Sequence, residues 1–257
     1  MDPVDKLDRR GVDLWLLPAD DAQLLEALPL VEAALLPHEL PRHQRIVVAR
    51  ARREYALTRV LVRRLLSRYV PVGPERWRFG ANDHGRPHVA SPREARALDF
   101  NVSHTAGMIV CLVGRERILG VDVEAADRVR RVLDIAERFF SPSEARALRA
   151  LPEAAQPDRF LAYWTLKEAY IKAQGKGLAI PLDHFSFHLD EGRDVRISFA
   201  PALEDDPHRW SFTRTRPSER HQLAVALWLD HRDELPPTIR TRDALPLLLE
   251  SADSSPT

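Results

Sequence analysis

Leu119-Gly120-Val121-Asp122-Val123-Glu124, a stretch near the middle of the 257-residue chain, predicts a β-strand because β-branched residues alternate with polar ones. Side chains two residues apart on a strand point to the same face, so Asp122 and Glu124 project together while Val121 and Val123 face the core. Two carboxylates this close repel each other unless a cation lies between them, and oxygen ligands suit a hard divalent ion. The strand therefore predicts a cation site, although two solvated residues on an exposed face would give the same pattern.

This strand begins the second of two series of secondary-structure elements that follow a similar order along the chain. In the first series we expect a strand at 12–17, short helices between 24 and 40, one long helix from about 41 to 69, and strands at 76–79 and around 100–113. In the second series, a capping pattern at 141–144 predicts a helix through 145–150, and a long helix fits 158–174 with Gly175 as its left-handed end. Strands then follow at 185–189, 195–199, 210–214 and 223–228. The shared order, with little shared sequence, indicates two similar halves.

Composition limits the partners that the protein can attract. Its 38 basic and 38 acidic residues cancel, so no overall field draws it toward nucleic acid or an anionic membrane, and any bound phosphate must be held by a local cluster. The single cysteine, Cys111, lies in the apolar run 108–113, which favours a buried strand thiol and excludes an intramolecular disulfide. A charged start and the lack of an apolar stretch of about 20 residues predict a soluble cytoplasmic protein, and the tail 251–257 is expected to be disordered.

A second acidic position lies in the segment 164–172, within the second long helix. Helical spacing places Trp164, Glu168 and Lys172 on one stripe. An ordinary amphipathic helix keeps its carboxylates away from the face that carries a tryptophan. Glu168 and Lys172 could form a surface ion pair worth only ~0.3–0.5 kcal/mol, or they could supply a third metal ligand beside a phosphate-binding ammonium. The glycines of Gly175-Lys176-Gly177 would let a ligand approach the backbone closely.

A third polar site lies in Phe100-Asn101-Val102-Ser103-His104. Adjacent strand residues point to opposite faces, so Ser103 and His104 are poorly arranged as a nucleophile and its base, which argues against a Ser-His hydrolase. If the strand ends here in a turn, both side chains can instead donate hydrogen bonds to a phosphate. A polar strand end without a ligand is the plainer alternative.

The chain carries four segments in a fixed order: Gly85-Arg86-Pro87, 100–104, 120–124 and 164–177. Together they resemble the surfactin-type (Sfp-like) 4′-phosphopantetheinyl transferase family over residues 40–230. The resemblance implies a holo-[carrier protein] synthase, which transfers the 4′-phosphopantetheine group of coenzyme A to a serine of an apo acyl or peptidyl carrier protein and releases 3′,5′-ADP. It also implies an α/β (α+β) fold of two pseudo-symmetric halves, 1–118 and 119–257, each a small sheet packed on a long helix, with coenzyme A in the cleft between them.

The resemblance also assigns roles to particular residues. It implies that Mg²⁺, or Mn²⁺, is bound together with the pyrophosphate of coenzyme A by Asp122, Glu124 and Glu168. The implied contacts to coenzyme A are Lys172 at the pyrophosphate, Arg86 and His104 near the nucleotide and its 3′-phosphate, and Ser103 beside them. The family carries a further coenzyme A-binding arginine in the first long helix. The register places Arg53 or Glu54 at that position, and charge favours Arg53, while additional contacts at Arg42 or Arg45 cannot be aligned.

The implied chemistry uses two residues of the second long helix. Lys172 would stabilise the departing 3′,5′-ADP, and Glu168 would accept the proton of the carrier's serine hydroxyl, directly or through water. The arginine-rich stretch 128–133, which follows the acidic strand, is expected to form a basic and partly apolar surface for the carrier protein. We expect the enzyme to be a monomer.

Two other functions share parts of this pattern. A Mg²⁺-dependent nucleotide hydrolase would use similar carboxylates with water as the nucleophile, but the sequence has neither a Nudix-like glutamate box nor a Walker-type glycine loop. A non-catalytic protein that binds coenzyme A or a carrier on the same fold would have lost one of the three carboxylates, and all three are present. The sequence leaves open which carrier protein is modified and whether fatty acid biosynthesis or the polyketide and peptide routes of secondary metabolism are served.

Overall fold

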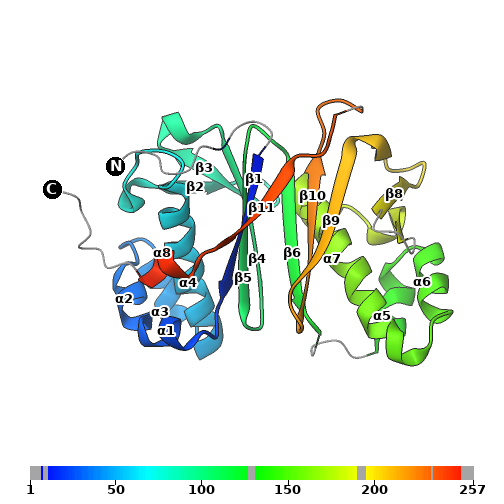
Figure 1. Ribbon diagram of the computed structural model, residues 1–257, viewed down its shortest axis with the longest axis horizontal. Helices are drawn as coiled ribbons and strands as arrows, with labels where there is room; N and C mark the ends of the chain where they lie inside the picture. The colour runs from blue at the N-terminus through cyan, green and yellow to red at the C-terminus, as the bar shows by residue number, and fades with distance from the viewer. Residues whose placement is uncertain (1–6, 8–10, 127–130, 190–194, 233, 250–257) are drawn as a thin grey trace.

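The computed structural model describes all residues except 1–6, 8–10, 127–130, 190–194, 233 and 250–257. Two sheets lie face to face in the middle of the molecule, and each has a long helix on its outer face, α4 (Ala49–Leu66) on one side and α7 (Gln156–Gln174) on the other (Figure 1). Each half is thus a sheet packed on a long helix. This arrangement confirms the predicted α/β (α+β) class with two similar halves.

The first half is built on a four-stranded sheet in the order β11-β1-β5-β4. Its strands are β1 (Gly11–Pro18), β4 (Leu98–Thr105), β5 (Met108–Arg115) and β11 (Thr238–Asp243). The helix α4 packs on this sheet through apolar residues spaced for one face, such as Leu57, Val60, Leu61 and Leu65, which are at most 1% exposed. Short helices cover the same core: α1 (Ala22–Glu26), α2 (Leu28–Ala33), α3 (Leu40–Arg45) and α8 (Leu245–Leu249). A hairpin of β2 (Arg78–Ala81) and β3 (Pro87–Ser91) lies beside them.

The second half is built on a three-stranded antiparallel sheet in the order β6-β10-β9. Its strands are β6 (Leu119–Ala125), β9 (Trp210–Ser218) and β10 (His221–Trp228). The helices α5 (Val132–Phe139) and α6 (Pro142–Arg149) and a hairpin of β7 (Phe185–Leu189) and β8 (Val195–Phe199) enclose α7. Single 3-10 turns lie at 74–76, 93–95, 153–155, 177–179, 182–184 and 207–209.

The inner faces of the two sheets form a third core. Valines and leucines of β1 and β5 pack there against those of β6 and β10, and they are almost completely buried. Val121 and Val123 lie in this core at 0% exposure, which confirms the predicted orientation of β6 and leaves Asp122 and Glu124 on the opposite, α7-facing side. Cys111 is also buried, in β5, and burial raises the pKa of its thiol far above the ordinary value, as expected of an unreactive strand cysteine.

A buried ion pair holds α7 to α6. Lys167 Nζ lies 2.8 Å from Glu144 Oε2, and both side chains are at most 1% exposed. Lys167 also donates to the carbonyls of Leu182 and Phe185, at 2.7 Å each, while burial lowers its pKa and the charge of Glu144 offsets part of that shift. Glu144 closes the predicted capping box with Ser141, which confirms the start of α6. The network leaves both charges hydrogen-bonded, as burial requires.

Two departures from the predicted elements have clear physical causes. The single helix expected at 41–69 is broken, because α3 ends at Arg45 and α4 begins at Ala49. The three residues between them, 46–48, are all β-branched and disfavour helix, and Val47 is 93% exposed.

The strand β11 was not predicted at all. It pairs in parallel with β1, so residues 238–249 return to the first half of the fold. There Arg240 Nε and Arg242 Nε lie 2.7 and 3.1 Å from the two oxygens of Asp13, a carboxylate at 0% exposure. The contact joins residues 227 apart, which local patterning does not reveal. The first half of the fold therefore includes a segment from beyond the expected boundary at 118/119, and that boundary stays a prediction.

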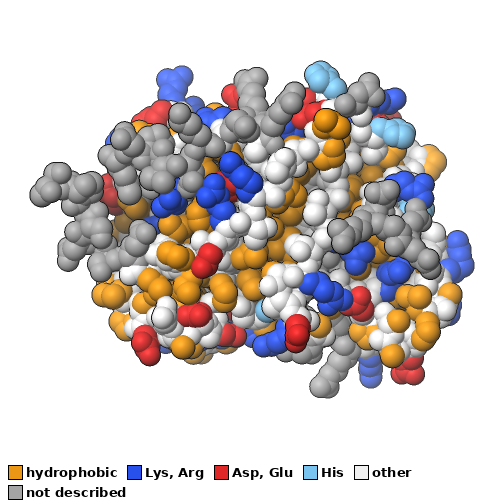
Figure 2. Space-filling model, viewed as in Figure 1, with side chains coloured by type: hydrophobic (Ala, Val, Ile, Leu, Met, Phe, Trp, Pro, Cys, Tyr) orange, Lys and Arg blue, Asp and Glu red, His pale blue; other side chains and the backbone are white. Residues whose placement is uncertain are grey.

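The surface agrees with the balanced charge of the chain. Figure 2 shows acidic and basic side chains interspersed over one face, with hydrophobic side chains gathered over α1, α2 and α8. The exposed leucines of that region include Leu25 and Leu30, at 38% and 65% exposure. None of the described helices is both long and apolar enough to cross a membrane.

Candidate active site

The helix α7 is buried on nearly every side. Between Phe160 and Ala173, the side chains that are not buried are Trp164, Glu168 and Lys172, spaced by four residues. The predicted stripe is thus the one open face of an otherwise buried helix. Its backbone approaches β6 closely at Gly120, where a Cβ atom would lie 2.1 Å from the carbonyl oxygen of Ala169. This close approach brings the stripe of α7 next to the acidic face of β6.

Asp122 and Lys172 meet at that contact. Asp122 is 4% exposed, and its Oδ1 accepts from Lys172 Nζ at 2.6 Å and from Ser103 Oγ at 2.8 Å. Its other oxygen, Oδ2, is buried and has no hydrogen-bond partner in the described part of the chain. Lys172 therefore pairs with Asp122 and not in the simple surface pair with Glu168 that the sequence allowed. Buried carboxylate oxygens normally have a partner, so an oxygen without a hydrogen-bond donor is a candidate ligand for a cation.

Glu168 lies near two other negative charges. Burial raises the pKa of its carboxyl, as do the charges of Asp122 and Glu124, while Lys172 lowers it. Glu124 is half-buried and accepts from Thr105 Oγ1 at 3.2 Å. The three predicted metal-binding carboxylates thus lie close enough to influence one another electrostatically.

The donor set fits a hard divalent cation, since it consists of oxygens only and one of them is buried without a partner. The described residues contain no group of three or more acidic, histidine or cysteine side chains already arranged to enclose a metal. The fit therefore rests on the unpartnered Oδ2 of Asp122 and on the closeness of three carboxylates, and not on a closed coordination shell; burial and then the neighbouring carboxylates raise the pKa of Glu168.

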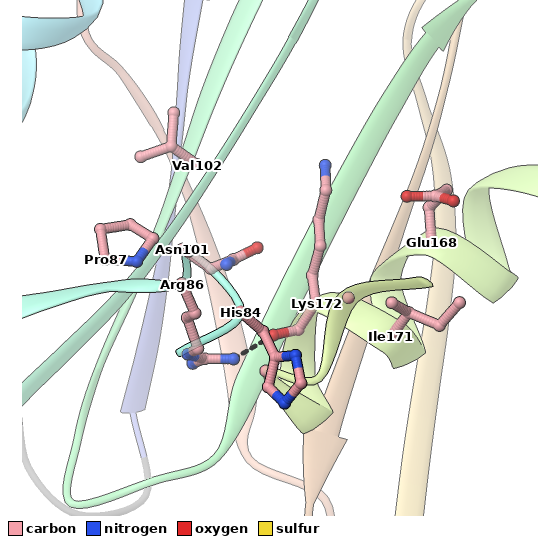
Figure 3. Close-up of a pocket in the computed structure, with 11 residues that line it drawn as sticks. His84, Arg86, Pro87, Asn101, Val102, Glu168, Ile171 and Lys172 are labelled. Carbon is pink, nitrogen blue, oxygen red and sulfur yellow. Dashed lines mark hydrogen bonds between the residues drawn. The ribbon is translucent and has the colours of Figure 1, made fainter. Parts of the chain in front are cut away.

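A cavity of about 250 Å³ lies at the seam between the two halves. Figure 3 shows Glu168 and Lys172 extending side by side from α7, with Asn101 and Val102 across from them. The turn between β2 and β3 forms the end of the cavity and supplies Arg86. Arg86 donates to the carbonyls of Ala173, Leu119 and Lys172, and burial lowers its pKa, with Asp99 opposing that shift. These bonds tie the turn to α7, so part of the guanidinium is already engaged in holding the cavity wall.

A second cavity of about 590 Å³ adjoins the first and shares Gly85, Pro87 and Val102 with it. Residues of α4, β2 and β4 form most of its lining, and apolar or aromatic side chains are the largest group among them. Its cationic groups are Arg42 and Arg59, whose guanidinium carbons lie 5.4 and 5.3 Å from the centre of the Tyr55 ring. An aromatic wall with two guanidinium groups suits a planar, negatively charged ligand.

The predicted site residues are divided between these places. Ser103 is buried at 5% exposure against Asp122 and Lys172, whereas His104 points to the other side and lines the larger cavity, as strand alternation predicts. Arg53 lines neither cavity and bonds to Asp20 at 3.0 Å, while its neighbour Glu54 lines the larger one. The assignment of Arg53 to coenzyme A therefore stays a prediction without support from this geometry.

Several residues of the site were missed or left open by the sequence argument. Arg42 lines the larger cavity, and Arg45 instead bonds to the carbonyl of Pro41. Arg59 and Tyr55 were not predicted, although their spacing of four residues on a helix was a usable signal. In the stretch 128–133 proposed for the carrier, residues 128–130 lie outside the described residues, as does the tail 251–257.

Comparisons with known proteins cover both halves of the chain. The model of the 4′-phosphopantetheinyl transferase superfamily matches residues 118–226, and that of the 4′-phosphopantetheinyl transferase N-terminal region matches residues 22–117. The 4′-phosphopantetheinyl transferase HetI of Nostoc sp. is 32% identical over 216 residues, which cover 84% of this chain and 87% of that protein. The 4′-phosphopantetheinyl transferase Sfp of Bacillus subtilis is 36% identical over 138 residues, or 54% of this chain and 59% of that one.

A solved structure is also similar. It is a holo-(acyl-carrier-protein) synthase from Bacillus anthracis in complex with CoA (3′,5′-ADP), which matches 44% of this chain and 96% of its own at 17% identity and a TM-score of 0.36. The relationship to HetI extends over most of both proteins, and the two family models together span both halves of the fold. The chain therefore belongs to the family of Sfp-like 4′-phosphopantetheinyl transferases.

Proposed function

We propose that this enzyme transfers the 4′-phosphopantetheine group of coenzyme A to a serine of an apo acyl or peptidyl carrier protein, with Mg²⁺, and releases 3′,5′-ADP. The proposal is based mainly on one observation: Asp122, Glu168 and Lys172 lie close together at the seam between the halves, beside two adjoining cavities. Membership of the family supports the reaction, and the arrangement supports the roles of the residues.

The two cavities divide the substrate between them. The larger cavity takes the adenosine and its 3′-phosphate, because its lining combines apolar and aromatic walls with the guanidinium groups of Arg42 and Arg59 and the ring N–H of His104. The smaller cavity takes the pyrophosphate, because it contains Lys172 and lies next to the acidic face of β6. The shared wall at Gly85, Pro87 and Val102 lets one extended molecule occupy both.

The carboxylates Asp122, Glu124 and Glu168 would hold Mg²⁺, which would neutralise the pyrophosphate and make its phosphorus more electrophilic. In the free enzyme Lys172 is fixed by Ser103 and Asp122, so its ammonium is already placed near the seam. There it binds the pyrophosphate and stabilises the negative charge that develops on the departing 3′,5′-ADP. Preorganisation of this kind costs no rearrangement during the reaction.

Glu168 acts as the general base. In the transfer, a bond forms between the serine oxygen and the phosphorus of the pantetheine arm, and the bond from that phosphorus to 3′,5′-ADP breaks. The serine proton passes to the carboxylate of Glu168, directly or through a water molecule. The carboxylate of Glu168 lines the smaller cavity beside Lys172 (Figure 3), which places it next to the proposed pyrophosphate site. No covalent intermediate with the enzyme is needed.

The decisive experiment is mass spectrometry of apo acyl and peptidyl carrier proteins after incubation with the enzyme, coenzyme A and Mg²⁺. The proposal expects the gain of one phosphopantetheine on a serine, together with one 3′,5′-ADP for each modified carrier. A carrier whose serine is replaced by alanine is the matched control and should stay unmodified. Cleavage of coenzyme A without carrier modification would instead identify a hydrolase, and binding without cleavage would identify a non-catalytic protein. A monomeric state and a cytoplasmic location belong to the same proposal.

A further inference from the structure

The edges of the two sheets face each other at β4 and β6, yet they are joined by side chains and not by a backbone ladder. β4 is the last strand of the first sheet and β6 the first strand of the second. Asn101 Oδ1 accepts from the backbone N–H of Val121 at 2.9 Å, and Ser103 Oγ accepts from that of Val123 at 3.4 Å. Side chains of β4 thus take the place of the carbonyls that a continuous sheet would offer.

Hydroxyl groups of β4 also donate hydrogen bonds to carboxylates of β6. Ser103 Oγ donates to Asp122 Oδ1 at 2.8 Å, and two residues further along both strands Thr105 Oγ1 donates to Glu124 Oε2 at 3.2 Å. The sequence separation is 19 residues in both pairs, so the pairing keeps a constant parallel register. Ser103 and Thr105 are 5% and 2% exposed, so both residues are buried at the seam between the sheets.

Each hydroxyl has one proton to donate and therefore fixes one oxygen of its carboxylate. At Asp122 the result is visible: Oδ1 accepts from Ser103 and Lys172, while Oδ2 is buried and has no hydrogen-bond partner among the described residues. At Glu124 the bond from Thr105 restrains the position of Oε2. A donor behind a ligating carboxylate orients it and reduces the freedom that metal binding would have to remove.

We propose that Thr105 is a positioning residue that orients Glu124 for the divalent cation, as Ser103 does for Asp122. This inference rests on the proposed function, because it concerns the cation site of the transfer reaction. Thr105 touches neither of the two cavities, so its effect passes through Glu124. A purely structural role in the seam between the sheets is the competing explanation, and it predicts a different set of changes.

The test is Thr105→Val, which keeps the shape of the side chain and removes the donor. Mn²⁺ binding is titrated calorimetrically with saturating coenzyme A, and melting is measured without metal. We expect Mn²⁺ affinity to fall by roughly 10- to 100-fold, the range seen when such outer partners are lost, with little change in the metal-free melting temperature. Thr105→Ser should restore the affinity to near the parent value. The matched control is Thr165→Val, because Thr165 is equally buried but its hydroxyl donates to the carbonyl of Leu161 at 2.9 Å, and its Mn²⁺ affinity should be unchanged.

Each outcome decides the question. If Thr105→Val melts at a lower temperature but binds Mn²⁺ as the parent does, Thr105 is structural and the inference is wrong, while the proposed function stands. If the parent protein itself binds no Mn²⁺ in the presence of coenzyme A, the cation assignment of the proposed function fails and takes this inference with it. If Thr105→Val does not fold, Thr105→Ala, which removes the donor with less bulk, is titrated in its place and judged by the same criterion.

Discussion

Glu168→Gln separates the catalytic role of this residue from its effect on stability. The amide keeps the size of the side chain but removes the proposed base and one of three neighbouring negative charges. Loss of a general base costs on the order of 10²- to 10⁴-fold in turnover. This range corresponds to about 3–5 kcal/mol of transition-state stabilisation, since each tenfold change is about 1.4 kcal/mol. We therefore expect phosphopantetheine transfer, followed by the mass of the carrier, to slow at least 10²-fold or so.

The same substitution should stabilise the metal-free fold. Burial and the charges of Asp122 and Glu124 raise the pKa of Glu168, so the folded protein holds this proton more tightly than the unfolded chain does. Ionisation of Glu168 therefore opposes folding. Below the ordinary glutamate pKa of about 4.3, Glu168 is protonated in both the folded and the unfolded protein, so its ionisation costs no folding free energy. Above the raised pKa of the folded state, Glu168 is ionised in both, and the full cost applies. The glutamine variant escapes this cost, so with chelator present it should melt higher than the parent near pH 8, and the difference should shrink toward about pH 4.

Thermal melts by circular dichroism at the two pH values, with chelator and then with Mg²⁺, complete the measurement. Because the variant has lost a ligand, Mg²⁺ should raise its melting temperature less than that of the parent. The exposed Glu153, changed to glutamine, is the matched control and should alter neither rate nor melting. Turnover within a few-fold of the parent would show that the base lies elsewhere, and an unchanged or lower melting temperature near pH 8 would refute the electrostatic reasoning.

Three further predictions follow from the contacts of the site and the core. Excess chelator should abolish transfer, with Mg²⁺ or Mn²⁺ restoring it and Zn²⁺ not, because the ligands are oxygens only; full activity in chelator would contradict the metal assignment. Arg59→Ala should raise the KM for coenzyme A by about tenfold or more, as expected for a lost charged hydrogen bond, whereas Arg53→Ala should change this KM little. If Arg53→Ala instead raises the KM more than Arg59→Ala does, the assignment of Arg53 from the sequence is favoured. Lys167→Met should lower the free energy of unfolding in urea by about 3–5 kcal/mol, because Glu144 is left as a buried charge without its partner, and a loss below about 1 kcal/mol would show that the pair is not needed.

Local periodicity predicted the parts of the site that lie on single elements. The alternation at 119–124 placed Asp122 and Glu124 on one face of β6, and four-residue spacing placed Glu168 and Lys172 on one stripe of α7. Both patterns follow from the geometry of a single helix or strand, so they can be predicted without knowing the tertiary structure. The order of the four motifs then identified the family.

The parts that could not be predicted depend on contacts between distant segments. Which oxygen of Asp122 is engaged is decided by Ser103 and Lys172, which lie on two other elements. The sequence could not decide between Arg53 and Glu54 on structural grounds, because charge alone does not say which face of α4 turns toward β4. The structure places Glu54 in the lining of the larger cavity and Arg53 outside both cavities, and the role of Arg53 stays a prediction. Arg59 lies on that face because it is one turn beyond Tyr55, and its role depends on a cavity wall that includes residues of β2 and β4.

The return of β11 to β1 has a consequence for the order in which the protein can fold during its synthesis. Arg240 must reach Asp13 across 227 residues, a distance that takes roughly 10 to 45 s to translate at about 5–20 residues per second. Until then β1 has an unpaired edge, and a carboxylate that will be fully buried lacks the arginines that neutralise it. The first half of the fold, although it is made first, is therefore completed last.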